Sequence, residues 1–254
     1  MIFVTGDCHA SFSKFSTQNF PEQKQLCKED VVIVLGDFGG VWEQQETKEE
    51  KWWLDWLNEK PYTTLFIDGN HENFDRLKKY PLKKRYGAFV HEIRPSVLHL
   101  MRGNIYTIEG KTFLAFGGAP SHDIKDGILD PSKPYFKEQK RYLEKSGKWM
   151  YRILGESWWP EELPNKNEYD RCLKNLDKVG WKVDYILTHD CPKGIAEVIN
   201  RNYGTAEIND FLDKIDKKCE FKHWYFGHYH FDWPIGQAHT CLYEEIIQLE
   251  EKII

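Results

Sequence analysis

The sequence predicts an α/β fold, and three patterns support this. Short apolar strands alternate with polar helical stretches over the first eighty residues, as in sheets whose parallel strands are joined by helices. Glycine-containing turns between later apolar runs indicate added antiparallel hairpins. The longest aliphatic run, residues 31–35, is typical of a strand buried on both faces and is too short to cross a bilayer.

Composition narrows the class of protein. The chain has 254 residues, of which 41% are hydrophobic and 30% charged, as expected of a folded globular protein. Its net charge of −5 argues against a dedicated nucleic-acid binder. The six cysteines form no CxxC pair, and the first residues lack the basic segment of a signal peptide. We therefore expect free thiols, no membrane association and a cytoplasmic location.

The elements of the N-terminal third follow one another as strand and helix. We expect strands at residues 2–5, 31–35 and 63–67, each apolar and bounded by polar residues. Residues 20–30 read as a helix and its connection, residues 46–60 as an amphipathic helix stopped by Pro61, and residues 73–80 as a short helix ended by Pro81. Such alternation predicts a largely parallel sheet.

The pattern changes in the rest of the chain. Residues 97–101, 105–108 and 112–116 read as strands joined in antiparallel hairpins, and residues 185–188 and 223–226 as further strands. Residues 195–198 and 208–215 between them read as helical, and residues 240–249 as a final strand or a strand leading into a tail. Residues 120–165, rich in proline and tryptophan, fit no regular period and predict either a surface excursion or a cap over a site.

Five polar clusters each follow a predicted strand. Ligands bind at the carboxyl ends of strands in open α/β sheets, so we expect the clusters to meet at one sheet edge. The clusters are Gly6-Asp7-Cys8-His9, Gly36-Asp37-Phe38-Gly39-Gly40, Gly69-Asn70-His71-Glu72, Thr188-His189-Asp190 and Gly227-His228-Tyr229-His230.

The side chains in these clusters suit metal ions. Asp7 and His9 are two residues apart, as are His228 and His230, so in an extended chain each pair would face one side and hold one ion. The pooled donors are two carboxylates, one amide and four imidazoles, enough for two metals, and Asp37 can bridge them. A mixed nitrogen and oxygen set suits Mn, Fe, Zn or Ni better than Mg or Ca.

The ordered series D-x-H, GD, GNHE, H and G-H-x-H resembles the calcineurin-like metallophosphoesterase superfamily, in a bacterial-type member. The motifs run from residue 6 to residue 230. The resemblance implies a single domain over residues 1–254, folded as a four-layer α/β/β/α sandwich with two divalent metals, Mn foremost. One metal would be held by Asp7, His9, Asp37 and His230, and the other by Asp37, Asn70, His189 and His228.

The resemblance also implies a reaction, the hydrolysis of phosphoesters by a phosphatase or phosphodiesterase. A metal-activated hydroxide would attack phosphorus in line, and His71 would protonate the leaving oxygen. The other reading of His71 is a hydrogen-bonding neighbour of the metal ligands. The substrate would be a phosphorylated small molecule, a nucleotide or a phosphoprotein, and oligomeric state is left open.

The sequence departs from the phosphoprotein phosphatase branch. Resemblance to that branch would imply an aspartate and an arginine at two positions where this chain has Gly40 and Val41. It would also imply an arginine before the GNHE motif, where this chain has Asp68-Gly69 before Asn70. Candidate substitutes at the site rim are His122 and Asp123, with Arg102, Arg141 and Arg152 as possible phosphate contacts.

Three alternatives to a general phosphoesterase stay open. They are a serine/threonine-type protein phosphatase, a nuclease acting on nucleic-acid ends, and a metal-retaining scaffold without catalysis. The net charge of −5, with no basic stretch evident, argues against the nuclease and makes a nucleic-acid partner unexpected. The complete set of seven metal donors, together with His71, argues against the scaffold.

Overall fold

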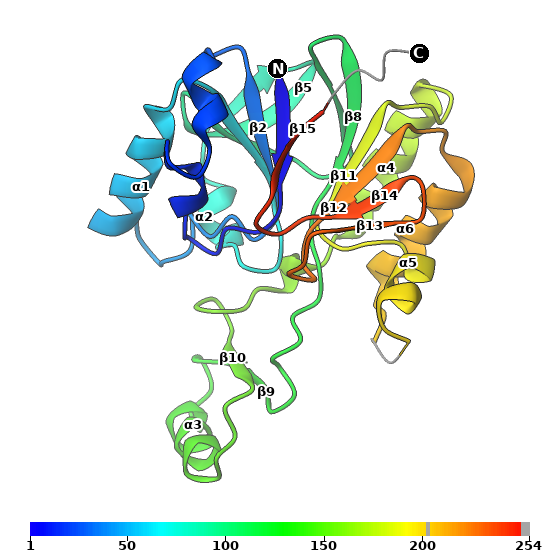
Figure 1. The fold of residues 1–254 in the computed structure, drawn as a ribbon. Coiled ribbons are helices and arrows are strands. Elements are labelled where there is room, and N and C mark those ends of the chain that lie inside the picture. The colour runs from blue at the N-terminus through cyan, green and yellow to red at the C-terminus, as the bar shows by residue number, and fades with distance from the viewer. Residues whose placement is uncertain (202–203, 250–254) are drawn as a thin grey trace.

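Two mixed β-sheets form the body of the computed structural model, which describes residues 1–201 and 204–249 (Figure 1). The first sheet has the order β15-β1-β2-β3-β6-β5-β4 and the second β13-β14-β12-β11-β8-β7. The first comprises β1 (Ile2–Thr5), β2 (Val31–Leu35), β3 (Thr63–Ile67), β4 (Leu82–Arg85), β5 (Ala88–Arg94), β6 (Val97–Leu100) and β15 (Ile246–Gln248). The second comprises β7 (Asn104–Ile108), β8 (Lys111–Phe116), β11 (Tyr185–Thr188), β12 (His223–Phe226), β13 (Trp233–Ile235) and β14 (His239–Cys241).

Helices cover the outer face of each sheet. Figure 1 shows α1 and α2 beside the first sheet and α4, α5 and α6 beside the second, with the two sheets between them. The predicted four-layer α/β/β/α sandwich is therefore confirmed. These helices are α1 (Lys48–Asn58), α2 (Phe74–Leu77), α4 (Lys166–Lys178), α5 (Lys193–Ile199) and α6 (Glu207–Lys218).

Three apolar cores hold the layers together, and β2 shows how one strand serves two of them. Val32 and Val34 pack into the core beneath α1, whereas Val31, Ile33 and Leu35 pack into the core between the sheets. Successive side chains of a strand point to opposite faces, so a continuous aliphatic run suits a strand with a core on each side. The third core lies between the second sheet and α4, α5 and α6.

The parallel centre of each sheet brings strand ends to one edge. β1, β2, β3 and β6 run parallel, as do β8, β11, β12 and β14. The expected parallel sheet of the N-terminal part is thus confirmed. The expected hairpin between residues 97–101 and 105–108 is wrong, because β6 belongs to the first sheet and β7 to the second. The hairpin of β7 and β8 is confirmed.

Other elements of the structure also differ from those expected from the sequence. Residues 20–30 contain a 3₁₀ turn, Pro21–Gln25, rather than an α-helix. The predicted final strand at 240–249 divides between β14 and β15, which lie in different sheets. The sequence reading also missed β4, β5, β13 and α4. The described residues include no helix long and apolar enough to cross a bilayer.

Residues 127–153 form an arm that extends away from the body (Figure 1). It is not irregular, as the sequence suggested, but holds β9 (Gly127–Leu129), α3 (Phe136–Lys145) and β10 (Tyr151–Ile153), with β9 and β10 paired in parallel. Its buried Leu129 and Leu143 belong to none of the three body cores. The arm therefore packs largely on itself. Its helix α3 lies away from the body and does not cover the ends of the strands (Figure 1).

We predict that the body folds without the tip of the arm. The amide of Asp126 donates to the carbonyl of Met150 at 2.7 Å, so the two ends of the arm are adjacent. Replacing residues 128–149 by Gly-Ser-Gly should shift the melting temperature by less than about 4 °C, the change expected from about 1 kcal/mol in a body of this size. Loss of cooperative melting in differential scanning calorimetry would contradict an independently packed arm.

Candidate metal centre

The five polar clusters meet where β1, β2, β3, β11 and β12 end. The loop after β1 lies against the loop after β2, because the amides of Cys8 and His9 both donate to the carbonyl of Asp37 at 3.0 and 2.7 Å. Backbone amides also tie the loops to the carboxylates. The amide of His228 donates to Asp7 Oδ1 at 3.0 Å, and the amide of His71 donates to Asp37 Oδ1 at 2.8 Å.

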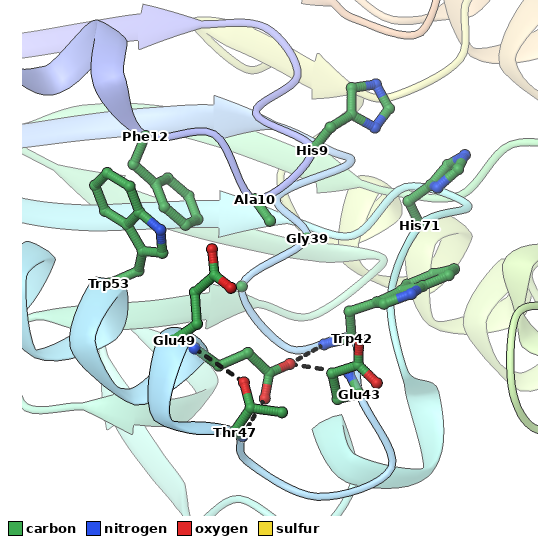
Figure 2. Close-up of a pocket in the computed structure, with 12 residues that line it drawn as sticks. His9, Ala10, Phe12, Gly39, Trp42, Glu43, Thr47, Glu49, Trp53 and His71 are labelled. Carbon is green, nitrogen blue, oxygen red and sulfur yellow. Dashed lines mark hydrogen bonds between the residues drawn. The ribbon is translucent and has the colours of Figure 1, made fainter.

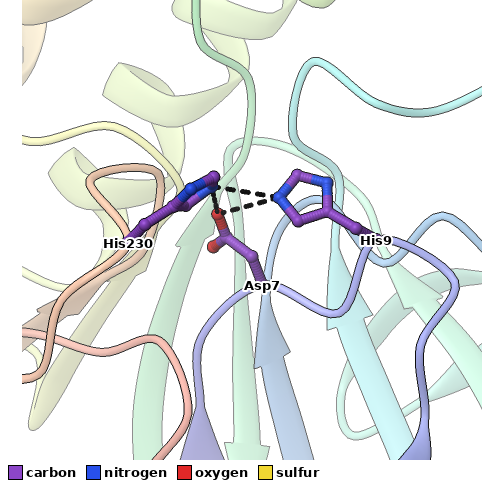
Figure 3. Close-up of side chains that lie close together, drawn as sticks. All are labelled: Asp7, His9 and His230. Carbon is purple, nitrogen blue, oxygen red and sulfur yellow. Dashed lines mark hydrogen bonds and ion pairs between the residues drawn. The ribbon is translucent and has the colours of Figure 1, made fainter.

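Asp7, His9 and His230 form the first group of potential metal donors (Figure 3). Oδ2 of Asp7 lies 3.1 Å from Nε2 of His230 and 3.7 Å from Nε2 of His9. The two imidazole nitrogens are 3.0 Å apart. Asp7 is buried, while the histidines are partly exposed, so the group opens toward solvent.

Asp37, His189 and His228 form a second, fully buried group. Nε2 of His189 lies 3.3 Å from Oδ1 of Asp37, and the rings of His189 and His228 are 4.9 Å apart. The groups adjoin, since Nε2 of His9 is 3.8 Å from Oδ2 of Asp37 and Nδ1 of His189 is 3.7 Å from Oδ1 of Asp7. Asp37 thus lies where it could serve both groups.

Within the described part of the chain, three buried atoms that could bind a metal lack a hydrogen-bond partner, and this suits the site to cations. Oδ2 of Asp7, Oδ1 of Asn70 and Nε2 of His189 are buried and make no hydrogen bond among the described residues. Leaving a buried polar atom unsatisfied costs about 1–3 kcal/mol. Nδ1 of His189 lies 2.7 Å from the carbonyl of Leu35, which can only accept, so Nδ1 carries the proton and Nε2 is left to bind a cation.

The electrostatics of the second group favour positive charge at its centre. Burial alone lowers the pKa of His189, but the charges of Asp37 and Asp7 outweigh it and raise this pKa to about 10. Burial raises the pKa of Asp37, but the charge and hydrogen bond of His189 outweigh burial and hold it below its usual value. A divalent cation would supply the same positive charge in place of a proton. Burial and the charge of His189 lower the pKa of His228, which favours the neutral imidazole that binds metals.

The backbone at the site is strained. His9, Asp37, His228 and His230 have φ values of 47°, 42°, 68° and 54°, in the left-handed region that non-glycine residues rarely adopt. Such residues cost about 1–3 kcal/mol each and cluster at functional sites. The expectation of an extended chain between paired residues is therefore wrong. Asp7 and His9 still share one group, but His228 and His230 turn into different groups.

Two glycines show why the loops need small residues. A Cβ on Gly36, whose φ is +91°, would lie 2.2 Å from Nδ1 of His189. A Cβ on Gly227 would lie 2.3 Å from Oδ1 of Asp7. At both positions only a residue without a side chain lets the loop approach the donors this closely.

His71 stands beside both groups. It forms a possible donor group with His9 and Asp37, and its ring lies 5.0 Å from that of His9. Its other neighbours differ in character. The ring of Trp42 stacks against it at a centroid distance of 5.4 Å, and Nη2 of Arg152 lies 3.4 Å from its Nε2. Burial lowers the pKa of His71, and the charge of Arg152 lowers it further.

The predicted rim residues separate. Nε2 of His122 lies 2.8 Å from Nε2 of His228, so His122 contacts the second donor group directly. Asp123 instead faces the arm, where it pairs with Arg152 at 2.5 Å. Of the three candidate arginines, Arg152 reaches the site, Arg102 is buried in a pair with Asp68, and Arg141 lies exposed on α3. Asp123 therefore adjoins the site only through its ion pair with Arg152.

Two further residues support the site loops, and one of them, Lys14, escaped the sequence reading. Lys14 is buried under the first loop and donates to the carbonyl of Asp7 at 2.8 Å. Glu72 accepts from the amides of Phe38 and Gly69 and joins two site loops. Only the fold shows the role of Lys14, because a lysine in a polar loop carries no signal of burial.

A second network ties the base of the arm to the loop after β3. The guanidinium of Arg102 donates to Oδ2 of Asp68 at 2.6 Å and to the carbonyl of Glu161 at 2.8 Å. Glu162 accepts from the amide and hydroxyl of Ser121 at 3.0 and 2.6 Å. Burial raises the pKa of Asp68, but Arg102 and His99 outweigh it and hold the pKa at about 2.

We predict that Asp37→Asn weakens binding at both donor groups. Removal of a shared carboxylate should exceed the roughly 10- to 100-fold loss in affinity that outer-shell changes cause. Equilibrium dialysis with Mn²⁺ would measure stoichiometry and affinity, and the metal-dependent rise in melting temperature would provide a second readout. Asp210→Asn, an exposed surface change, is the control. Equal Mn²⁺ affinity in the two variants would contradict the assignment.

The comparisons with known proteins agree with this geometry. The family model of the calcineurin-like phosphoesterases matches residues 1–232. Curated relatives include lariat debranching enzymes of Danio rerio, 25% identical over 79% of this chain, and of Homo sapiens, 22% identical over 94%. Lariat debranching enzyme A of Xenopus laevis is 28% identical over 85%.

The alignments cover 33%, 37% and 44% of the Danio, Xenopus and human proteins, so this chain matches less than half of each. The family model, in contrast, takes in all five polar clusters, since they lie between residues 6 and 230. The resemblance inferred from the motifs is confirmed, and with it the class of enzyme, a hydrolase of phosphoester bonds. The chain belongs to the calcineurin-like phosphoesterase family.

Proposed function

We propose that the chain is a divalent-metal-dependent phosphodiesterase acting on nucleotide diesters. The observation that carries the proposal is the convergence of six potential metal donors from four loops beside His71, while the fifth loop carries His71 and, next to it in the sequence, Asn70, whose Oδ1 is buried and unpartnered among the described residues. Asp7, His9, Asp37 and His230 would hold one cation, and Asp37, Asn70, His189 and His228 the other. Such cations supply positive charge to the phosphate oxygens and lower the pKa of water. The mixed nitrogen and oxygen donors suit Mn, Fe, Zn or Ni better than Mg or Ca, and among these we propose Mn²⁺ on the family resemblance. The six free cysteines support a cytoplasmic location.

Charge favours a diester over a monoester. A phosphodiester carries one negative charge, whereas a monoester carries close to two at neutral pH. Beside His71, the chain offers the guanidinium of Arg152, and Asp123 already neutralises part of its charge. Arg102, buried against Asp68, contributes no free charge. This modest positive potential suits the less charged substrate.

Two observations favour nucleotides as the groups on the phosphate. The curated relatives are named for the debranching of lariats. Residues 133–152 of the arm carry seven basic and two acidic side chains, although the whole chain has a net charge of −5. The same segment exposes Tyr135, Tyr142 and Trp149. This concentration of charge weakens the sequence argument against nucleic acid, and cleavage of a polynucleotide is the second candidate function.

The chain's own residues would divide the remaining work. His71, beside His9 and Asp37, would give its proton to the departing oxygen. Arg152 would bind a phosphate oxygen with a charge-assisted hydrogen bond, in place of the arginines of the protein phosphatase branch. Asp123 would orient the guanidinium of Arg152, which it contacts at 2.5 and 2.8 Å.

We predict faster hydrolysis of a diester than of a monoester. Protein freed of metal and reloaded with Mn²⁺ should hydrolyse bis-p-nitrophenyl phosphate at least about tenfold more efficiently than p-nitrophenyl phosphate, a difference of about 1.4 kcal/mol in transition-state binding. Asp37→Asn provides the blank. A preference for the monoester would overturn the diester assignment, and no turnover of either ester by protein shown to hold metal would contradict a general phosphoesterase.

His71→Gln should affect substrates according to their leaving group. An alkoxide needs a proton to depart, so a dinucleotide should lose about 10²- to 10⁴-fold in kcat. A p-nitrophenolate is a stable anion and should lose less than about tenfold. Metal content, measured in parallel, separates this role from metal binding by His71. Equal losses on both substrates at full metal occupancy would exclude the proton donor.

Arg152→Met should lower kcat/KM for the diester by about 10- to 100-fold, the value of one hydrogen bond between charged groups. Arg152→Lys should restore part of this loss, because the charge returns without the planar fork. Arg141→Met, an exposed change on the same arm, is the matched control. An unchanged kcat/KM in Arg152→Met would show that the guanidinium does not touch the substrate.

A further inference from the structure

A cavity of about 330 Å³ opens directly beside His9 and His71 (Figure 2). It lies between the loop after β1, the loop after β2 and the start of α1. This volume falls within the range of small-molecule sites, roughly 300–1,000 Å³. Because the cavity touches His71, whatever fills it lies on the side of the phosphate from which a group protonated by His71 departs.

Aromatic rings form the apolar walls of the cavity. Phe12 and Trp53 stand on one side, and Trp42 lies on the other beneath His71 (Figure 2). Phe12 and Trp53 contact each other with ring centroids 5.6 Å apart, and Trp42 stacks on His71 at an interplanar angle of 25°. Flat aromatic groups are the ligands that such walls bind best.

The loop that carries Trp42 is held in place before any ligand binds. Glu50 of α1 is buried and accepts from the amides of Trp42 and Glu43 at 2.7 and 2.9 Å. Its carboxylate also pairs with Arg76 at 2.8 Å. The cavity is thus preformed, which limits the ordering entropy that binding must overcome.

The negatively charged groups of the cavity are carboxylates, which only accept hydrogen bonds. The carboxylates of Glu43 and Glu49 line it, and the described residues give neither side chain a hydrogen bond or an ion pair. Glu49 points into the space between the rings (Figure 2). No lysine or arginine among the described residues lines the cavity. A second phosphate would be repelled here, whereas a flat group that donates N–H bonds would be bound.

We propose that this cavity binds the base of the leaving nucleoside and selects guanine. The inference rests on the proposed function and extends it to the substrate's identity. A carboxylate only accepts hydrogen bonds and can take two at once. Guanine presents two adjacent donors, N1–H and the 2-amino group. Adenine and cytosine present a ring-nitrogen acceptor beside their amino group, and uracil has one donor between two carbonyls, so each places lone pairs against the carboxylate.

Binding of nucleoside 5′-monophosphates tests the inference without relying on turnover. Titration of the Mn²⁺-loaded protein should quench tryptophan fluorescence, with GMP at least about tenfold tighter than AMP, CMP or UMP. Glu49→Gln should reduce the GMP preference to less than about threefold, because an amide presents a donor beside its acceptor. Glu59→Gln, an exposed change at the C-terminal end of the same helix, should keep the full preference.

Equal binding of the four nucleotides would overturn guanine selection, and phosphocholine binding tighter than GMP would identify an ammonium site instead. Hydrolysis of bis-p-nitrophenyl phosphate is measured on the same samples. Diester hydrolysis without base preference would remove this inference and leave the phosphodiesterase standing. Guanine preference without diester hydrolysis would keep the base site and overturn the phosphodiesterase.

Discussion

The position of Asp37 is the constraint on which the site depends. Its carboxylate is buried between His189 and the amide of His71, and its backbone adopts a φ of 42°. Burial of an aspartate in left-handed backbone is costly on both counts, so the surrounding structure must hold it there. The carbonyl of Asp37 accepts from two amides of the first loop, and its side chain faces both donor groups. Asp37 therefore lies between the two groups of potential metal donors.

The packing of the sheets behind the site offsets the free-energy cost of holding Asp37 buried in this conformation. Four of the strands that lead to the site, β1, β2, β3 and β11, are fully buried and end within one residue of a polar cluster, so their loops begin from fixed points. Supports such as Lys14 and Glu72 then join one loop to the next through backbone atoms. Like-charged groups can be held together in this way before a cation arrives, because the cores behind them resist relaxation.

The local sequence pattern predicted those features of the fold that depend on neighbouring residues in the chain. The run at residues 31–35 identified a strand buried on two faces. The predicted hairpin between residues 97 and 108 was wrong because a turn sequence does not determine whether the next strand belongs to the same sheet. The prediction of an irregular segment at the arm was wrong for another reason. Its core is small and its strands pair in parallel over a long separation, so neither hydrophobic period nor turn spacing marks them.

The site residues divide along the same line. Candidate ligands were visible because they sit in short motifs at strand ends. Arg152 could be named from the sequence only as one of three arginines and Trp42 not at all, since each reaches His71 through tertiary packing alone. Those two neighbours give His71 opposite surroundings. On one side lies the base of an arm rich in positive charge, and on the other an aromatic cavity bordered by carboxylates. The proposed diester substrate has a charged centre and two organic groups, so this polarity would favour one orientation, with the phosphate toward Arg152 and the departing group toward Trp42. The asymmetry around a single histidine would thereby decide which ester bond breaks.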